Sequence, residues 1–314
     1  MNDNRPLVYF TSLIDSKNDL LQSLVAKYST KVGTFITVVD DPRDANFIII
    51  AETGYFGLSD LSAALHRSNI FRGKYVLMIN NTDWPYPVFD GFYPSLTKRC
   101  SGAYPWAFHL AQAPNVCIEK EQANRRKYLY SFVGRASTHN VRKRLLALDR
   151  ADCPCIDIDN IPKRLGTFDN DITYAEIMYN SHFVLCPRGF GASSIRLFEV
   201  MRAGRVPVII SDKWTAPPVG DWNSFSIKIG ENDIHNIPFI LASRKHFAGE
   251  LGRIARETYT TYFSSEVYLE VLITFYLQRA RLFSRNRLMW RSVSRIGARE
   301  IRSFFKEFTL KNRS

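Results

Sequence analysis

The sequence predicts an α/β protein of two domains, each built on a mainly parallel sheet. Strand and helix patterns alternate through the first third of the chain, the polar segment EKEQANRRKY interrupts them at 119–128, and a second alternation follows. At 314 residues the chain is long enough for two domains of ordinary size. We therefore expect domains at 1–120 and 121–270, with basic helices at 271–314 packing back across them.

In the first domain, the patterns predict strands and helices in the rhythm of βαβ units. Strands are expected at 7–13, 34–40, 47–52 and 74–80, and helices at 18–29 and 58–68, the second helix with Ser59 as its N-cap. The segment 81–106 is rich in aromatic residues, Pro and Gly. A loop of that length is more often a functional surface than a simple connection.

The second domain repeats the rhythm. We expect strands at 128–134, 155–158, 182–187, 206–211 and 225–229, and helices at 138–150 (with Thr138 as N-cap), 171–181 and 195–204, with further helical patterns from 233 to 308. The ligands of open α/β sheets bind beyond the carboxyl ends of the strands. The turns that follow these strands are therefore where binding residues are expected.

Composition restricts the class of protein. A hydrophobic content of 46% and an aromatic content of 13% indicate a folded chain. The sequence has no apolar run near the roughly 18–20 residues of a spanning helix, and MNDNRPLVYFTSL does not resemble a secretory signal. Five scattered cysteines and the absence of His/Cys/Asp ligand spacing give no indication of a metal site. We expect a reduced cytoplasmic protein that requires no metal or other cofactor.

The segment 182–212, HFVLCPRGFGASSIRLFEVMRAGRVPVIISD, places charged residues around a glycine turn between two buried strands. The glycines allow close approach of the backbone, and a helix N-terminus favours a negative ligand. The arginines can bind phosphate, and a glutamate one helical turn later can accept hydrogen bonds from ribose hydroxyls. The candidate binding residues here are Arg188, Gly189, Gly191, Ser193, Ser194, Arg196 and Glu199.

A second turn carries a similar signal. The segment SFVGRASTHNVRKR places Arg135 and Arg142 after the strand at 128–134. Glycine with arginine at two strand ends is typical of a diphosphate site. Spacing alone supports equally an ordinary glycine turn with a surface Arg–Glu pair, since neither turn has the lysine of a P-loop or the pattern GxGxxG.

The block from Tyr174 to Leu241 resembles the C-terminal, donor-binding half of the exostosin family of glycosyltransferases (GT47-like), and SFVGR with the arginine at 142 resembles the phosphate-side motif that precedes it. The resemblance implies a GT-B fold, in which two Rossmann-like domains face each other across a cleft. It also implies a nucleotide-sugar donor, most often UDP-linked, inversion at the anomeric carbon and no obligatory metal. Arg196 and Glu199 would then hold phosphate and ribose, and Arg135 and Arg142 the diphosphate.

Direct displacement of this kind needs a general base near the acceptor hydroxyl, and the base is expected from the first domain. Asp83, which follows the strand at 74–80, is the first candidate, although an aspartate here is also typical of turn capping. Asp90, Glu52 and His109 are further candidates. The expected acceptor is a glycan or lipid-linked glycan in polysaccharide biosynthesis.

Several other side chains have two possible roles. Among Trp84, Tyr86, Phe89, Phe92 and Tyr93 we expect most to pack beneath their loop and one or two to contact sugar. Trp214 and Trp222 are expected at the rim of the donor pocket, Asp212 to contact the donor or cap a turn, and His139 and His182 to be structural.

The net charge of +12 is concentrated at the end of the chain, where the last 36 residues hold eleven Lys and Arg against two Glu. This basic, amphipathic tail is expected either to bind the anionic inner face of a membrane or to pack across the domains. Two other functions stay open. One is a nucleotide-sugar-binding scaffold without turnover. The other is a nucleic-acid-binding protein, which is disfavoured because the arginines cluster at strand ends.

Overall fold

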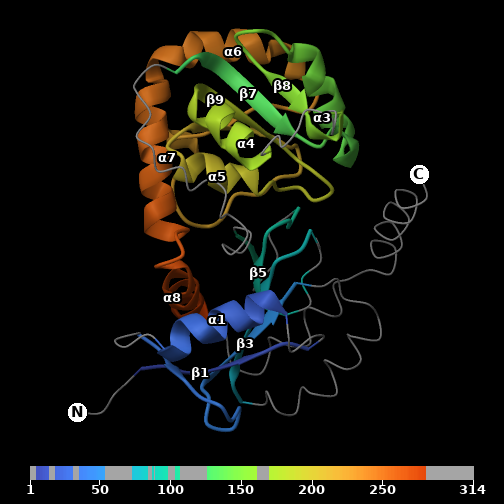
Figure 1. The fold of residues 1–314 in the computed structure, drawn as a ribbon. Helices are drawn as coiled ribbons and strands as arrows, with labels where there is room; N and C mark the ends of the chain where they lie inside the picture. Colours follow the sequence, from blue (N-terminus) through green and yellow to red (C-terminus); the bar gives the residue numbers. More distant parts are fainter. Residues whose placement is uncertain are drawn as a thin grey trace. The chain divides into compact units, whose positions relative to one another are not determined.

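The computed structural model describes two compact units (Figure 1). One unit groups Met1–Tyr93, Cys100–Tyr104 and Ile273–Ser314, and the other groups Pro94–Arg99 and Pro105–Leu272. The residues that the structure describes are 5–13, 18–30, 35–53, 73–83, 87, 89–97, 103–106, 126–160 and 170–280.

The first unit holds a six-stranded sheet in the order β2-β1-β3-β4-β5-β6. The pairs from β2 through β5 are parallel. Every residue of β3 is buried, as expected for the central strand of a covered parallel sheet. The strands are β1 (Leu7–Thr11), β2 (Thr37–Val38), β3 (Phe47–Glu52), β4 (Tyr75–Asn80), β5 (Gly91–Tyr93) and β6 (Ala103–Pro105).

Two of the described helices pack against this sheet. Helix α1 (Asp19–Thr30) follows Asn18, whose side-chain oxygen accepts a hydrogen bond from the backbone N–H of Leu21 at 2.8 Å and so caps the first turn. The later part of α8 (Tyr268–Ala280) returns to the same unit. Its Tyr276 hydroxyl donates to the carbonyl of Val76 in β4 at 3.2 Å. The chain therefore ends its described part on the sheet with which it began.

The first unit differs from the predicted pattern in two places. Strands β5 and β6 lie inside the segment predicted as one long loop, and β2 has two residues where a run of seven was predicted. Three-residue strands give no periodic signal, and an edge strand needs only the residues that pair with its neighbour. The predicted helix at 58–68 lies outside the described residues.

The second unit holds a five-stranded parallel sheet in the order β11-β10-β9-β7-β8. The strands are β7 (Tyr128–Gly134), β8 (Cys155–Asp157), β9 (Ser181–Pro187), β10 (Val206–Ile210) and β11 (Ile227–Lys228). The helices are α3 (Asn140–Leu145), α4 (Asn170–Tyr179), α5 (Arg196–Arg202), α6 (Ile237–Arg244) and α7 (Ala248–Tyr262). Two parallel sheets with helices confirm the α/β class. The cleft expected between the domains stays a prediction.

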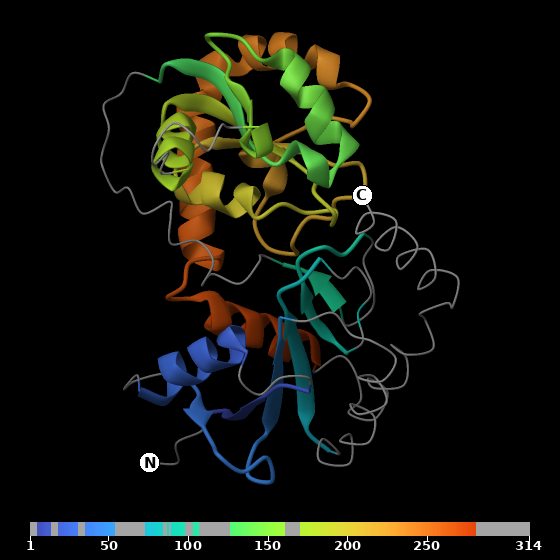
Figure 2. The same ribbon diagram turned by 45° about the vertical axis from the view of Figure 1, so that its right-hand side comes forward.

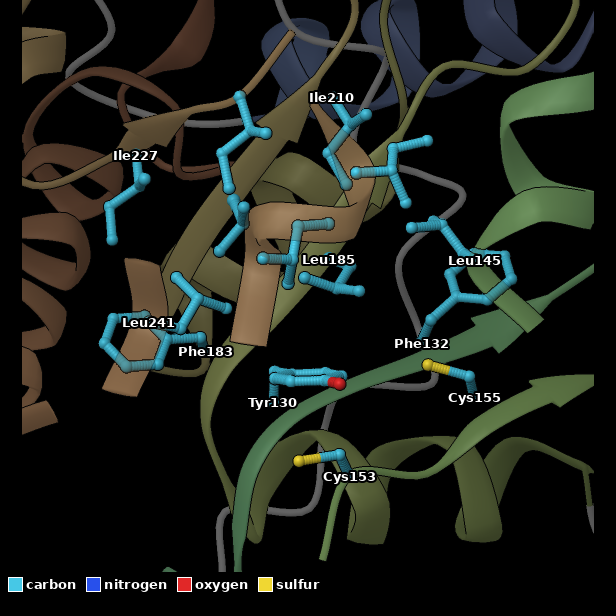
Figure 3. Close-up of a cluster of buried hydrophobic side chains, with 14 of the residues drawn as sticks. Tyr130, Phe132, Leu145, Cys153, Cys155, Phe183, Leu185, Ile210, Ile227 and Leu241 are labelled. Carbon is cyan, nitrogen blue, oxygen red and sulfur yellow. The ribbon is translucent and has the colours of Figure 1, made fainter. Parts of the chain in front are cut away.

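One continuous hydrophobic core is formed by residues of the second sheet and of the helices packed beside it (Figure 3). Tyr130 and Phe132 of β7 and Phe183 and Leu185 of β9 are fully buried in it, and α6 contributes Leu241. Alternate residues of adjacent strands share one face, so these side chains form a single apolar layer. This layer holds rigidly the strand ends where the candidate residues lie.

The start of helix α3 is a correction to the sequence prediction. The N-cap is His139, whose Nδ1 accepts a hydrogen bond from the backbone N–H of Val141 at 3.2 Å, and not Thr138. Residues Ala136–Thr138 form a short 3-10 turn that ends before the helix begins. The expected structural role of His139 is confirmed. Among the described helices none is long and apolar enough to cross a membrane.

Candidate functional site

The turns that follow β7 and β9 lie at the same edge of the second sheet, because the two strands are adjacent and parallel, with Tyr128 opposite Ser181 and Ser131 opposite Val184. Both arginine-bearing turns, which the sequence placed at strand ends, therefore lie at one carboxyl edge. The side chains at this edge differ from one another in burial and in hydrogen bonding.

Arg196, at the start of α5, is a buried cation with 7% of its surface exposed. Its guanidinium carbon lies 5.0 Å from the ring centre of Phe132 and 5.6 Å from that of Tyr174. Nη2 donates to the carbonyl of Val133, while Nε and Nη1 are buried and have no hydrogen-bond partner among the described residues. Buried donors are normally satisfied. Two unsatisfied donors on a buried cation indicate a site for an anionic or oxygen-rich ligand.

Gly134 provides the space that this guanidinium occupies. A Cβ atom added at Gly134 would lie 2.5 Å from Nη2 of Arg196 and 3.4 Å from the ring of Phe132. No residue with a side chain fits without displacing the guanidinium. The glycine of the motif SFVGR therefore has a packing role, and it fixes where the cation lies.

Tyr174 of α4 connects the arginine to the glutamate, and our sequence analysis did not propose it as a site residue. Its ring lies beside Arg196, and its hydroxyl donates to Oε2 of Glu199 at 2.5 Å. Burial raises the pKa of Tyr174 well above its usual value, with Glu199 raising it further and the Arg196 cation opposing the shift. The hydroxyl therefore stays protonated and keeps donating. A single tyrosine on a helix gives no spacing signal.

Arg142 links the two turns through backbone oxygens. Its Nε donates to the carbonyl of Arg188 at 2.9 Å, Nη2 to that of Pro187 at 3.3 Å and Nη1 to that of Arg135 at 3.3 Å. A Cβ atom at Gly189 would lie 3.3 Å from the same guanidinium. Arg142 therefore acts on the shape of the site by holding both turns in place. Direct contact with a diphosphate, as the resemblance implied, stays a prediction for this residue.

Arg188 lies between these turns and a loop beyond β11. Its side chain is 14% exposed, with Nη1 3.9 Å from Oε1 of Glu231 and Nη2 donating to the carbonyl of Phe190 at 3.2 Å. Its Nε is buried and has no hydrogen-bond partner within the described part of the chain. Glu231 is a second residue that the sequence did not indicate. It comes after β11, the last strand of the sheet, and its contact with Arg188 is not visible in the sequence.

Asp212 has the turn-capping role that was one of its two expected roles. Its carboxylate accepts from the backbone N–H of Glu231 at 3.0 Å, and its own backbone N–H donates to the Glu231 carboxylate at 3.0 Å. This reciprocal pair closes the segment after β10 onto the segment after β11. Donor contact by Asp212 stays a prediction.

The remaining candidates of the second unit fall into two groups. The Arg135 side chain is 68% exposed and lies 3.6 Å from the carboxylate of Asp159, which makes it a solvated ion pair. Ser193 and Ser194 are buried in the turn before α5, together with Gly191. The helix itself begins at Arg196, so the predicted contribution of the serine N–H groups to a helix N-terminus is corrected: they belong to the preceding turn.

The aromatic residues near these segments are mainly packing residues. Phe89, Phe92 and Tyr93 are buried, so the expectation that most of their loop aromatics pack is confirmed for these three, while Trp84 and Tyr86 lie outside the described residues. Trp222 is buried and meets Trp214 edge to face at 5.2 Å. Their predicted place at a pocket rim stays a prediction.

The candidate bases of the first unit differ in accessibility. Glu52 is 1% exposed, and its carboxylate accepts from the Ser12 hydroxyl at 3.0 Å and from the backbone N–H of Leu13. These contacts give Glu52 a structural role at the end of β1. Asp90 is also buried, whereas Asp83 is half-buried in the segment after β4. His109 lies outside the described residues.

Comparison with known proteins identifies the domain that holds this site. Residues 94–244 match the Exostosin GT47 domain, and this span includes every candidate residue from Arg135 to Glu199. The chain carries an exostosin-family domain. The two sheets with their helices agree with the GT-B fold that the resemblance implied, and the facing arrangement of two domains stays a prediction.

Relatives of this exostosin domain are longer proteins. An Exostosin-1 homolog of Caenorhabditis elegans is 42% identical over 95 residues, which cover 29% of this chain and 25% of the relative. A probable glycosyltransferase of Arabidopsis thaliana is 38% identical over 88 residues, which cover 24% and 17%. Exostosin-1 of Bos taurus is 33% identical over 125 residues, which cover 37% and 16%. The match with each of these spans a quarter or less of the relative.

A solved structure of an α1,3-fucosyltransferase aligns with most of this chain. The similarity covers 92% of this chain and 93% of that one, with 11% identity and a TM-score of 0.45.

Proposed function

We propose that this chain is an inverting glycosyltransferase that moves a sugar from a UDP-sugar donor to a glycan or glycoconjugate acceptor by direct displacement. The observation that supports this most directly is the buried guanidinium of Arg196, which has two unsatisfied donors inside an exostosin-family domain. A cation held in a dry site with donors in place stabilises charge that develops on a leaving group.

In this proposal, Arg196 binds the phosphate oxygens of the departing nucleoside diphosphate. The rings of Phe132 and Tyr174 hold the guanidinium from its faces and leave the N–H donors at its edge for the ligand. Planar N–H donors match phosphate oxygens in a bidentate manner. The positive charge is therefore fixed before the bond to the sugar breaks, and little reorganisation is needed during the reaction.

Glu199 has a binding role in this proposal. The Tyr174 hydroxyl donates to Oε2, so one carboxylate oxygen is oriented by the protein. An ionised carboxylate can accept several hydrogen bonds, which leaves capacity for ribose hydroxyls. Tyr174 is then a positioning residue, since it acts on the ligand through Arg196 and Glu199.

Arg188 and Arg142 complete the proposed diphosphate site in different ways. Arg188 has a buried Nε that can donate to the diphosphate, and Arg142 binds backbone carbonyls of both turns and so holds them in place. Displacement also needs a base for the acceptor hydroxyl, and we propose Asp83, the most accessible of the described carboxylates that were candidates for this role. The leaving group is neutralised by guanidinium groups in this scheme.

Titration calorimetry with UDP tests the proposed donor site. We expect Arg196→Lys to weaken UDP binding about 10- to 150-fold, because a hydrogen bond to a charged group contributes about 1.5–3 kcal/mol and lysine lacks the planar fork. Arg253→Ala is the control, since this exposed arginine of α7 pairs with Glu250 and Glu257 away from the sheet edge. Equal UDP affinity in both variants would show that Arg196 does not bind the donor.

Turnover distinguishes the enzyme from a nucleotide-sugar-binding scaffold. We expect the wild-type chain to release UDP from a UDP-sugar, Asp83→Asn to lose transfer while it keeps UDP binding, and the product to have the inverted anomeric configuration by NMR. Binding of UDP without release by the wild-type chain would favour the scaffold. A thermal shift with an oligonucleotide and none with UDP would favour the nucleic-acid-binding function. The expected cytoplasmic location stays a prediction, and the basic tail lies outside the described residues.

A further inference from the structure

A corner of the second unit exposes apolar residues that a soluble surface normally avoids. Helix α6 ends at Arg244, a 3-10 turn follows at Lys245–Phe247, and α7 begins at Ala248. All six residues from 242 to 247 are exposed. Phe239 in α6 is 80% exposed, and Phe247 in the turn is 56% exposed. We call Phe239, Arg244, Lys245, His246 and Phe247 the α6–α7 corner.

These phenylalanines are two of the three exposed large hydrophobic residues in the described part of the chain. The third, Phe190, lies in the glycine turn of the donor site. Burying a phenylalanine side chain contributes about 1.5–3 kcal/mol. A ligand or surface that covered both exposed rings, eight residues apart, would therefore gain binding free energy from each of them. Along a helical path, residues eight apart point about 80° from one another, so both rings can engage a single surface.

The charged side chains between the two phenylalanines are basic, and the acidic residue that follows them, Glu250, pairs with Arg253 at 2.6 Å. Arg244, Lys245 and His246 separate the two phenylalanines. The cations that act electrostatically on His182, at the start of β9, are Arg126, Lys245 and Arg205. Figures 1 and 2 place the meeting point of α6 and α7 beside the beginning of β7, at the amino end of the sheet. The corner therefore belongs to a basic surface at the opposite edge of this sheet from the donor site.

We propose that the α6–α7 corner docks on an anionic lipid bilayer. Phe239 and Phe247 enter the boundary between head groups and acyl chains, while Arg244 and Lys245 contact lipid phosphates. Exposed aromatic rings flanked by basic residues have the chemistry that binds such surfaces. A protein partner would need about 800 Å² of complementary surface on this unit, whereas a bilayer adapts to two projecting rings.

Hydrogen exchange of the full-length chain with vesicles tests this proposal. We expect sedimentation with vesicles of phosphatidylcholine and phosphatidylglycerol and none with phosphatidylcholine alone. We also expect slower exchange in peptides that cover 237–250 only when anionic vesicles are present. Exchange reports the corner and the basic tail in separate peptides, so binding by one is not mistaken for binding by the other.

Paired variants give the expected magnitudes. Phe239→Ser and Phe247→Ser should each weaken vesicle binding about tenfold or more, since each removes one inserted ring. Lys245→Glu should weaken it at least fivefold, from a contribution of about 1 kcal/mol per cation near an anionic surface. The matched controls are Phe190→Ser, an exposed phenylalanine away from the corner, and Arg43→Glu, an exposed arginine of the first unit; both should bind vesicles as the wild type does.

Three outcomes would overturn the proposal. The first is vesicle binding with protection only in the tail. The second is wild-type binding by both corner serine variants, with circular dichroism showing all variants folded. The third is protection of peptides 237–250 by a duplex oligonucleotide but by no vesicle, which would make the corner a nucleic-acid surface.

Discussion

Replacement of Gly134 by alanine tests the geometry of the proposed donor site. The new Cβ atom would lie 2.5 Å from Nη2 of Arg196, whereas ordinary contacts of a Cβ atom begin at 3.4 Å. The guanidinium must therefore move by about 0.9 Å, and that movement breaks its hydrogen bond to the carbonyl of Val133.

The magnitude follows from this bond and from the backbone. Loss of a hydrogen bond to a charged group costs about 1.5–3 kcal/mol, and the smaller entropy of an unfolded chain with alanine returns about 0.4–1 kcal/mol. We expect the free energy of unfolding to fall by roughly 1–2 kcal/mol. Because the displaced guanidinium no longer meets the ligand, UDP affinity should fall at least tenfold.

Urea denaturation and UDP titration of Gly134→Ala measure the two effects separately. Gly249→Ala is the matched control, since a Cβ atom there meets nothing within 4 Å and alanine favours a helix. Unchanged stability and unchanged UDP affinity in Gly134→Ala would refute the argument that this glycine fixes the cation. A fall in stability alone would keep the packing argument and contradict the donor site.

Three further predictions concern the second unit. Tyr174→Phe should lower the free energy of unfolding by about 1–3 kcal/mol in urea, because the half-buried Glu199 carboxylate loses a donor; an unchanged value would mean that water replaces the hydroxyl. Burial and nearby cations lower the pKa of His182 to about 4. Between pH 6.5 and 4 the unfolded chain thus binds a proton at His182 that the folded chain does not. The free energy of unfolding should therefore decrease as the pH is lowered from 6.5 to 4, and it should decrease less steeply in His182→Gln. Gly252→Ala should cost about 1–3 kcal/mol, because its Cβ atom would lie 2.4 Å from a backbone oxygen; a melting temperature equal to that of Gly249→Ala would contradict this.

The sequence predicted best the elements whose residues are buried on both faces. The strand predicted at 47–52 is β3, and that at 128–134 is β7, with the same bounds. Continuous runs of β-branched and aromatic residues between turns indicate a buried strand in such segments. The short strands β5 and β6 were not predictable, since their pairing depends on neighbours distant in sequence and not on any local pattern.

The candidate site was predictable in its residue types and less so in their roles. Motif spacing brought Arg196, Glu199 and Arg142 to one sheet edge, as the strand order confirms. It did not reveal that Arg142 is engaged by three carbonyl oxygens, or that Tyr174 joins the other two residues. Side-chain direction depends on packing between elements, and residues such as Tyr174 and Glu231 are recognised only when that packing is known.

The close contact of α5 with α7 has a mechanical consequence. Gly204 ends α5 in a left-handed conformation with φ of +64°, and its carbonyl meets Gly252 of α7 without side chains between them. Gly252 lies four residues after Ala248, where α7 begins, so this contact is roughly 6 Å along the helix from the α6–α7 corner. With the corner resting on lipid at the amino end of the sheet, the seven residues of β7, roughly 23 Å long, separate the bilayer side from the strand ends of the proposed donor site, and an acceptor tethered to that bilayer needs a spacer of comparable length.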